Sequence, residues 1–398
     1  MTPHNKLRMT HRPFKIGIVA GERSGDALGA GLLRALYARA PDAQCSGLGG
    51  EAMLQENFHS IADMQRLSVM GILEPLKRLP DLFALRRALR EHFIAQGVDI
   101  VVTIDSPDFN LGLARQLKAR GIRCCHYVCP SVWAWRQGRV RKIAASIDHV
   151  LCLLPFEEKF LRQHGIAASF VGHPLADKLC PAPAQQASGG LSEQDGAFPT
   201  LCIMPGSRDS EVSALLEPFL QAALRCVATL PELHILIPAA TPAIASRIQR
   251  ELSRADYAVL LGKCELRESF LSGESQAAMR EATVVLLASG TATLEAALMG
   301  LPMVVAYRMS ALGFALASRL VKVKHVALPN LLLGERAVPE LVQNEATPAR
   351  LSEEVLGLLQ DPAARQAIQR RFAKLGAELA KDADSRAAEQ VLALASDG

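Results

Sequence analysis

The chain has 398 residues and a formal net charge of +4, a length that exceeds one typical core and predicts about two domains. Hydrophobic residues make up 49%, aromatic residues 5% and charged residues 21%, which fits a soluble α/β protein rich in alanine and leucine. No segment approaches the roughly 20 apolar residues of a membrane span, and no apolar core of a signal peptide follows the basic N-terminus. The nine cysteines lie mostly in apolar runs, as expected for free thiols in a reducing compartment.

Apolar, strand-like runs alternate with helical patterns along the chain, as in parallel sheets with crossover helices. The predicted strands are Lys15–Ala20, Asp99–Ile104, Arg123–Val128, His149–Leu154, Leu201–Met204, His234–Pro238, Ala258–Leu261, Val284–Ala288 and Met303–Tyr307. Segment 181–199 is rich in Pro, Ala, Gln, Ser and Gly and is expected to link domain 1–180 to domain 200–346. The helical tail 347–398 is expected to pack on the first domain or on a partner chain. The predicted fold is two doubly wound, Rossmann-like domains facing across a cleft.

The first strand ends in the loop Gly21-Glu22-Arg23-Ser24-Gly25-Asp26. This loop lacks the G-x-G-x-x-G fingerprint of dinucleotide-binding proteins. Its carboxylates suit sugar hydroxyls better than pyrophosphate, so Glu22 and Ser24 are candidate sugar contacts. The alternative is that Ser24 or Asp26 only caps the following helix.

Segment 77–92 carries five basic residues against two acids, interleaved with apolar side chains. It is predicted to be an amphipathic helix, and it is a candidate for association with an anionic membrane surface. Its basic and apolar residues include Leu82, Phe83, Arg86, Arg87, Leu89 and Arg90. The alternative is a helix packed on its own sheet with a solvated basic face. A nucleic-acid partner is not expected, because aromatic residues are few and no recognition motif is present.

The loop Asp105-Ser106-Pro107-Asp108-Phe109-Asn110 follows the strand Asp99–Ile104. Functional groups of open α/β sheets gather at the carboxyl ends of strands, where a carboxylate can act as a general base. Asp105 is the first candidate and Asp108 the second. The alternative, an Asp-Pro turn that begins a helix, explains Asp108 better than Asp105.

Cys124, Cys125, His126 and Cys129 suggest a metal site at first sight. On an extended strand, Cys125 and Cys129 would be about 13 Å apart, too far for ligands that each lie about 2.0 to 2.3 Å from one zinc ion. We therefore expect no metal and no cofactor.

Two loops in the second half are suited to anions. Pro205-Gly206-Ser207-Arg208 follows an apolar strand, and arginine offers a planar fork of donors for phosphate oxygens. Ser289-Gly290-Thr291-Ala292-Thr293-Leu294-Glu295 follows another strand and opens a helix, whose N–H groups and dipole favour a diphosphate. Glu295, about one turn further on, can accept two sugar hydroxyls. The alternatives are an ordinary turn with a solvated arginine and a capped strand-to-helix connection.

These segments together resemble lipid-A-disaccharide synthase, a glycosyltransferase family of the GT-B architecture, over nearly the whole chain. The Pro130-Ser131-Val132-Trp133-Ala134-Trp135-Arg136 segment is the most specific match. Further matches, in the family's order, are the Gly21–Asp26 loop, Met70-Gly71-Ile72, Asp105–Asn110, His126-Tyr127-Val128, Gly172-His173-Pro174, Pro205–Arg208, Ser289–Glu295 and Leu328-Pro329-Asn330-Leu331. Arg23 and Cys129 depart from the residues usual at those places.

The resemblance implies that UDP-2,3-diacylglucosamine is joined to 2,3-diacylglucosamine 1-phosphate (lipid X), with inversion at the anomeric carbon and release of UDP. Asp105, or else Asp108, would be the base, and Arg208 would stabilise the leaving diphosphate. The donor would contact Ser207, Arg208, Ser289, Gly290, Thr291, Glu295 and Asn330.

The resemblance also implies a place in the cell. Because both substrates carry acyl chains, the protein is expected on the inner face of the inner membrane of a Gram-negative bacterium, bound peripherally. Membrane association is then expected to involve Leu82, Phe83, Arg86, Arg87, Leu89 and Arg90. A homodimer is one option that the sequence leaves open. Rival interpretations are another GT-B enzyme, such as the peptidoglycan N-acetylglucosaminyltransferase or a UDP-N-acetylglucosamine epimerase, and a protein that binds UDP at the membrane surface without turnover.

Overall fold

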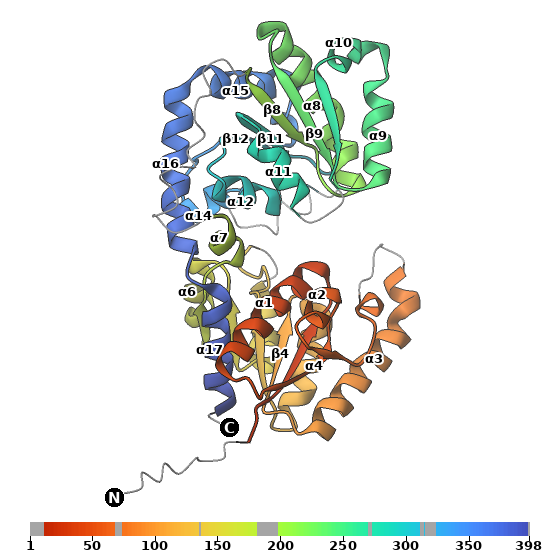
Figure 1. Cartoon of the computed structure of the whole chain (residues 1–398), viewed down its shortest axis with the longest axis vertical. Coiled ribbons are helices and arrows are strands. Elements are labelled where there is room, and N and C mark those ends of the chain that lie inside the picture. The colour runs from red at the N-terminus through yellow and green to blue at the C-terminus, as the bar shows by residue number, and fades with distance from the viewer. Residues whose placement is uncertain are drawn as a thin grey trace, which may run out of the picture. The chain divides into compact units, whose positions relative to one another are not determined.

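The structure, a computed structural model, describes residues 12–67, 74–134, 137–180, 198–269, 273–310, 314 and 324–396. The Met70-Gly71-Ile72 match, the Trp135-Arg136 pair and residues 181–197 of the predicted linker lie outside this part of the chain. Its internal contacts divide the chain into two compact units (Figure 1). Unit 1 comprises Met1–Pro174 and Lys381–Gly398, and unit 2 comprises Leu175–Ala380.

Unit 1 is built around a seven-stranded parallel sheet with the order β3-β2-β1-β4-β5-β6-β7. Its strands are β1 (Lys15–Ala20), β2 (Gln44–Leu48), β3 (His59–Ser60), β4 (Ile100–Ile104), β5 (Arg123–Tyr127), β6 (His149–Cys152) and β7 (Ala168–Phe170). Its helices are α1 (Arg23–Arg39), α2 (Glu51–Leu54), η1 (Met64–Arg66), α3 (Glu74–Gln96), α4 (Pro107–Lys118), η2 (Gln137–Arg139), α5 (Val140–Ser146), α6 (Pro155–Gln163) and α17 (Ala383–Ser396).

Unit 2 contains a six-stranded parallel sheet with the order β10-β9-β8-β11-β12-β13. Its strands are β8 (Thr200–Met204), β9 (His234–Ala239), β10 (Cys264–Glu268), β11 (Val284–Ala288), β12 (Met303–Tyr307) and β13 (Glu340–Val342). Its helices are α7 (Pro174–Leu179), α8 (Asp209–Thr229), α9 (Pro242–Leu252), η4 (Ala255–Tyr257), α10 (Ala258–Leu261), α11 (Glu274–Arg280), α12 (Thr291–Leu298), α14 (Leu328–Leu333), η5 (Gln343–Glu345), α15 (Pro348–Gln360) and α16 (Pro362–Leu379).

Both sheets therefore have the doubly wound order expected from the alternation of strands and helices. The central strands are buried on both faces, as expected for predominantly apolar sequences such as Ile100–Ile104 and Val284–Ala288. In each sheet the strand order reverses beside the first strand, between β1 and β4 in unit 1 and between β8 and β11 in unit 2. Ligands of open α/β sheets bind outside the carboxyl ends of the strands at such a reversal.

One predicted strand is wrong. Ala258–Leu261 forms the short helix α10, and the edge strand of this region is β10, Cys264–Glu268. Periodicity cannot distinguish a helix from a strand in four apolar residues. The side chains of Val259 and Leu261 are more than half exposed, so the run is apolar without being core.

The helical tail divides between the two units. Helices α15 and α16 belong to unit 2, whereas α17 packs along α1 in unit 1 (Figure 1). A cluster of buried side chains from β1, β4, α3, α4 and α6 forms the core of unit 1. None of the described helices has the length and apolar character needed to cross a membrane. The nine cysteines are free thiols, and seven of them are buried.

Candidate active site

The candidate residues of unit 1 lie at the reversal of its strand order. β1 ends at Ala20 and leads into the loop of Glu22 and Ser24, while the adjacent strand β4 ends at Ile104 and leads into Asp105. Because the strands are parallel and adjacent, both loops leave the same edge of the sheet. The structure thus brings together two segments about 80 positions apart in the sequence.

The turn after β4 has an unusual backbone. Asp105 has φ of 51° and Ser106 has φ of 41°, both in the left-handed region that residues other than glycine adopt rarely. The neighbouring strand β5 is followed by Val128, a β-branched residue with φ of 79°. The Asp105 N–H donates to the carbonyl of Tyr127 at 3.0 Å, which ties the two strained turns together. Strained backbone of this kind clusters at functional sites and persists only where surrounding contacts hold it.

Asn110 supplies these contacts from the first turn of α4. Its side chain is fully buried, and its Nδ2 donates to the carbonyls of Asp105 at 2.7 Å and Ile104 at 3.2 Å. In the described part of the chain, no hydrogen bond or ion pair engages the half-buried carboxylate of Asp105. The turn therefore presents a carboxylate that no described side chain or backbone group engages.

Asp108, the second candidate base, has a different environment. Its side chain is 76% exposed, and its Oδ1 lies 2.9 Å from Nη2 of Arg139. The Asp108 carboxylate is thus already engaged by a cation of its own unit. The geometry therefore favours Asp105 over Asp108.

The loop after β1 contains both exposed and structural residues. Glu22 and Ser24 are exposed at the start of α1, where Glu22 is the N-cap residue. Asp26 is buried and accepts hydrogen bonds from the N–H groups of Gly50 at 2.7 Å, Ala52 at 3.0 Å and Met53 at 3.2 Å. Asp26 thus caps the neighbouring helix α2 rather than its own helix, which the sequence left open.

Helix α3 carries the predicted membrane residues. Phe83 is 58% exposed, Leu82 is partly buried and Arg87 is exposed with its Nε 2.8 Å from Glu91. Leu89 is fully buried in the core of unit 1, so its assignment to the exposed face is wrong. It shares the core-facing side of α3 with Leu85, one turn before it.

The other two arginines of α3 are partly buried. Arg90 donates to Oε1 of Gln116 on α4 at 3.1 Å. Arg86 lies in a pocket of about 500 Å³ that also contains Phe83 and the loop residues Ser106 and Asp108. This pocket adjoins the turn that carries Asp105.

The candidate residues of unit 2 also lie at a reversal of strand order. In the loop after β8, Gly206 has φ of 130°, and a Cβ built on it would come within 2.5 Å of the Glu211 Cβ. Glu211 accepts from the N–H groups of Ser207 at 3.0 Å and Arg208 at 3.3 Å, and from Nη1 of Arg208 at 2.9 Å. The Arg208 side chain is nevertheless 79% exposed, so its guanidinium can reach a ligand.

The loop after β11 presents the start of α12. Ser289 is anchored on both sides, since its N–H donates to Ala306 at 2.9 Å and its Oγ donates to the carbonyl of Val326 at 2.6 Å. Gly290 and Thr291 are exposed, and the α12 N-terminus begins at Thr291. Exposed N–H groups at a helix start form a site for an anion.

Glu295 lies one turn into α12 and is partly buried. Oε2 accepts from Nε2 of Gln276 on α11 at 3.3 Å. Burial raises the pKa of Glu295, whereas the hydrogen bond from Gln276 and the charge of Lys178 act in the opposite direction. Gln276 orients the carboxylate, and no residue pattern near Glu295 indicates this pairing.

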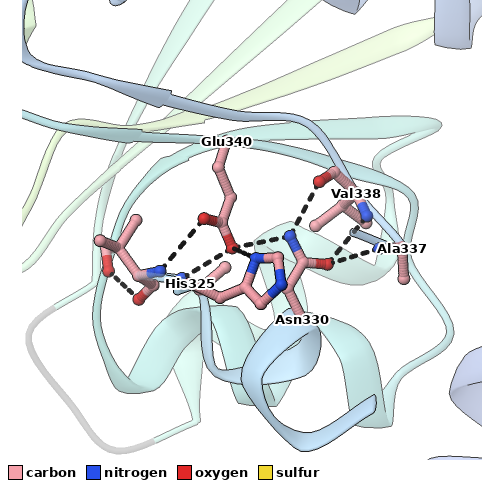
Figure 2. A network of polar contacts seen from close by, with 8 residues as sticks. His325, Asn330, Ala337, Val338 and Glu340 are labelled. Atoms are coloured by element: carbon pink, nitrogen blue, oxygen red, sulfur yellow. Dashed lines mark hydrogen bonds and ion pairs between the residues drawn. The ribbon is translucent and has the colours of Figure 1, made fainter. Parts of the chain in front are cut away.

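Asn330 is part of an internal network (Figure 2). Its Nδ2 donates to the Val338 carbonyl at 2.9 Å and to Oε1 of Glu340 at 2.7 Å, and its Oδ1 accepts from the N–H groups of Ala337 at 2.8 Å and Val338 at 2.9 Å. Asn330 is fully buried. It therefore offers no side-chain atom to a sugar nucleotide in this conformation, and its expected direct contact gives way to a positioning role.

Glu340 is the residue on which this network converges, and sequence reasoning missed it. Its carboxylate accepts from the N–H groups of Val326 and Ala327, both at 3.1 Å, and lies 3.6 Å from Nδ1 of His325 (Figure 2). Val326 also accepts a hydrogen bond from Ser289, in the loop 289–291 that opens α12 and that we call the anion loop. Glu340 therefore holds the segment that supports the anion loop.

A cluster that sequence reasoning did not predict lies at the ends of β5 and β6. Among the described residues, the buried side chains of Cys129, Cys152 and Glu157 have possible metal-ligand atoms within 4.8 Å of one another. Glu157 already accepts from Nε1 of Trp133 and from the Leu154 N–H, both at 3.1 Å, and burial raises its pKa to about 8. We interpret Glu157 as a cap of α6 that also orients Trp133.

Comparisons with known proteins agree on one family. The family model described as lipid-A-disaccharide synthetase matches residues 16–393. The chain is 47% identical over 387 residues to the lipid-A-disaccharide synthase of Chromohalobacter salexigens, covering 97% of this chain and 98% of that protein. It is 44% identical over 397 residues to the lipid-A-disaccharide synthase of Xanthomonas campestris pv. campestris, covering 98% and 89%.

Solved structures with the same arrangement of elements are more distant in sequence. They include a UDP-GlcNAc 2-epimerase from Neisseria meningitidis, with a TM-score of 0.63, 13% identity and coverage of 97% of this chain and 100% of that one. MurG from Acinetobacter baumannii matches with a TM-score of 0.56, 14% identity and the same coverages. At these identities the likeness shows the GT-B fold alone.

Proposed function

The chain belongs to the lipid-A-disaccharide synthase family, and we propose that it forms the lipid A disaccharide by one inverting displacement with Asp105 as the base. The donor is UDP-2,3-diacylglucosamine and the acceptor is 2,3-diacylglucosamine 1-phosphate. The observation that carries this mechanism is the strained turn at Asp105. Asn110 holds that turn, which presents an unpaired carboxylate at the reversal of the strand order.

Asp105 takes the proton of the acceptor's 6-hydroxyl as its oxygen attacks the anomeric carbon of the donor. The bond between that carbon and the diphosphate oxygen breaks, and its electron pair leaves with UDP. Attack from the side opposite to the leaving group inverts the anomeric centre and gives the β-1′,6 linkage. A general base of this kind typically contributes about 10²- to 10⁴-fold to the rate.

The leaving diphosphate gains negative charge, so it needs fixed positive groups. Arg208 supplies a guanidinium on an exposed loop, and the exposed N–H groups at Gly290 and Thr291 supply the start of α12. Ser289 is held by Val326 and fixes this loop, while Ser207 lies beside Arg208. Glu295, oriented by Gln276, would accept the ribose hydroxyls.

The acyl chains of both substrates lie in a membrane, and α3 offers a surface for docking. Phe83 is 58% exposed and Leu79 is 39% exposed, beside the exposed Arg87. This combination of exposed apolar and basic side chains suits the anionic inner leaflet, with the protein on its cytoplasmic side. Sedimentation with phosphatidylglycerol vesicles should fall for Phe83→Ser combined with Arg87→Glu. It should stay unchanged for Arg34→Glu on α1; equal sedimentation of all three proteins would exclude this surface.

The proposed reaction is tested by mass spectrometry of disaccharide and UDP from the two substrates. Wild type should form both products, Asp105→Asn should lose at least about a hundredfold in rate while remaining folded, and Asp108→Asn should retain most of its activity. Full activity of Asp105→Asn would assign the base elsewhere. The coupling constant of the new anomeric proton in the NMR spectrum checks the inversion, since a retained α configuration would rule out a single displacement.

A further inference from the structure

Arg86 is set apart from the other arginines of α3 by its surroundings. Its Cζ lies 4.9 Å from the ring centroid of Phe109 and 5.7 Å from that of Phe83. Its Nε is buried without a hydrogen-bond partner, and within the described part of the chain its guanidinium makes no ion pair. Arg87 and Arg90, by contrast, have partners in Glu91 and Gln116. A guanidinium that is held by aromatic rings and has unused N–H donors can bind an anion.

Helix α4 leaves room for this guanidinium at Gly112. A Cβ built on Gly112 would come within 2.9 Å of Arg86 Cζ, 3.0 Å of Nη1 and 3.2 Å of Nη2. Glycine is a poorer helix former than alanine, so a glycine inside α4 needs a packing reason. That reason is the Arg86 side chain, which lies directly against the backbone of the helix that begins beside Asp105.

The pocket around Arg86 is amphipathic. Its volume of about 500 Å³ is in the range of small-molecule sites. Leu79, Leu82 and Phe83 of α3 line it, together with Leu67, Pro107 and Phe109. Its polar groups include Ser106, Glu22 and Asp108, and the charge of Asp108 is balanced by Arg139. Such a pocket suits a molecule with an anionic group next to an acyl chain.

We propose that Arg86 binds the phosphate of the acceptor, while the apolar wall of the same pocket receives part of one of its acyl chains. This inference rests on the proposed function, because it places the acceptor beside Asp105. Arg86 is then a residue that determines specificity, since it distinguishes a phosphorylated acceptor from one without the phosphate. Its assignment to the membrane surface is replaced by this role.

The test compares kcat/KM for 2,3-diacylglucosamine 1-phosphate with kcat/KM for 2,3-diacylglucosamine without the phosphate. Charge-assisted hydrogen bonds to one phosphate correspond to a preference of about ten- to a hundredfold for the phosphorylated acceptor in wild type. Arg86→Met keeps an unbranched apolar side chain and removes the guanidinium, so its preference should fall towards one. Gly112→Ala, which displaces the guanidinium, should lower the preference as well.

The matched control is Arg34→Met, because Arg34 is an exposed arginine of unit 1 that pairs with Glu56. Its preference should equal that of wild type. Both acceptors are tested on the same preparation, so a fraction of unfolded enzyme cancels from the ratio. An unchanged preference in Arg86→Met would overturn the proposal. The proposal is also overturned if Arg86→Met keeps the preference but loses binding to phosphatidylglycerol vesicles, since Arg86 would then bind a membrane headgroup.

Failure of the proposed function has a different signature. If wild type forms no disaccharide, binding of the two acceptors is measured directly by calorimetry in detergent micelles. Tighter binding of the phosphorylated acceptor by wild type than by Arg86→Met would support the Arg86 site without the reaction. Equal binding by both proteins would overturn it.

Discussion

The side-chain amide of Asn110 donates a 2.7 Å hydrogen bond to the backbone carbonyl of Asp105, the proposed base. A second bond from the same amide nitrogen reaches the carbonyl of Ile104, the last residue of β4. Two consecutive residues in the left-handed region, Asp105 and Ser106, follow that strand. The direction of the proposed catalytic carboxylate therefore depends on Asn110, a fully buried residue.

Replacing Asn110 by leucine should move the Asp105 carboxylate while leaving the carboxylate itself in the protein. The variant loses both hydrogen bonds, so Asp105 relaxes from its strained conformation, which costs about 1–3 kcal/mol to maintain. We expect kcat to fall about ten- to a hundredfold with little change in KM for either substrate. Thr103→Val is the control, since it removes a buried hydroxyl from β4 without touching the turn. If both variants retain the wild-type kcat, Asn110 does not position Asp105.

Gly206 should be required for binding of UDP. Its φ of 130° is strained for any other residue, and a Cβ would approach the Glu211 Cβ to 2.5 Å. Gly206→Ala should therefore displace Ser207 and Arg208 and weaken UDP binding, measured by titration calorimetry, by at least about tenfold. Gly262→Ala provides the comparison, because a Cβ there meets nothing within 4 Å. Equal affinities of the two variants would show that the Gly206 loop does not bind the diphosphate.

The sequence was sufficient to predict the loops of the candidate site, because each loop directly follows a strand that can be recognised from its own residues. Apolar runs ending in Gly, Ser, Asp or Arg located the carboxyl ends of β1, β4, β8 and β11, because a strand boundary and its loop are encoded within a few residues. The alternation of elements gave two parallel sheets, which the structure confirms. The strand predicted at 258–261 was wrong because four apolar residues are too few to distinguish the period of a helix from that of a strand.

Partners that are distant in the sequence were not predictable. Nothing near Asp108 indicates that Arg139 neutralises it, and nothing near Asn330 indicates that Glu340 and the backbone around Val338 use all its hydrogen bonds. The spacing of Arg86 and Leu89 in the sequence matches that of the predicted membrane-facing residues of α3. In the structure, however, Leu89 lies in the core of unit 1 and Arg86 lies in a pocket. Such assignments require the packing of α3 against its sheet and against α4.

Glu340→Gln should weaken the support of the anion loop of unit 2, although Glu340 is connected to that loop only through Val326. The carboxylate accepts from two backbone N–H groups and from Asn330, and an amide in its place would turn its own N–H groups towards donors. A buried donor left unpaired costs about 1–3 kcal/mol, so thermal unfolding should shift to a lower temperature. UDP binding should weaken severalfold, because Val326 holds Ser289. Glu345→Gln, at an exposed position, should change neither quantity; unaltered UDP binding in Glu340→Gln would contradict the coupling.

His126 should make unit 1 sensitive to acid. The ring is fully buried, with Nδ1 2.8 Å from Thr103 Oγ1 and with Nε2 lacking a hydrogen-bond partner among the described residues. Desolvation by burial lowers its pKa to about 4, although the contact with Thr103 acts in the opposite direction. Between this value and the unfolded pKa of about 6.5, the unfolded chain binds more protons than the folded one. Stability contributed by His126 is therefore complete above pH 6.5 and is lost as the pH falls towards 4, by roughly 3 kcal/mol.

The measurement compares urea unfolding of wild type and His126→Phe at pH 7.0, 5.5 and 4.5. Both tryptophans of the chain, Trp133 and Trp135, belong to unit 1, so their fluorescence reports its unfolding. Glu157 has the opposite effect, because burial raises its pKa to about 8 and stability then falls as the pH rises above about 4.5. The difference between wild type and variant at each pH removes this contribution, which both proteins share. Wild type should lose stability relative to His126→Phe as the pH falls, whereas parallel curves would show that His126 is not buried as a neutral ring.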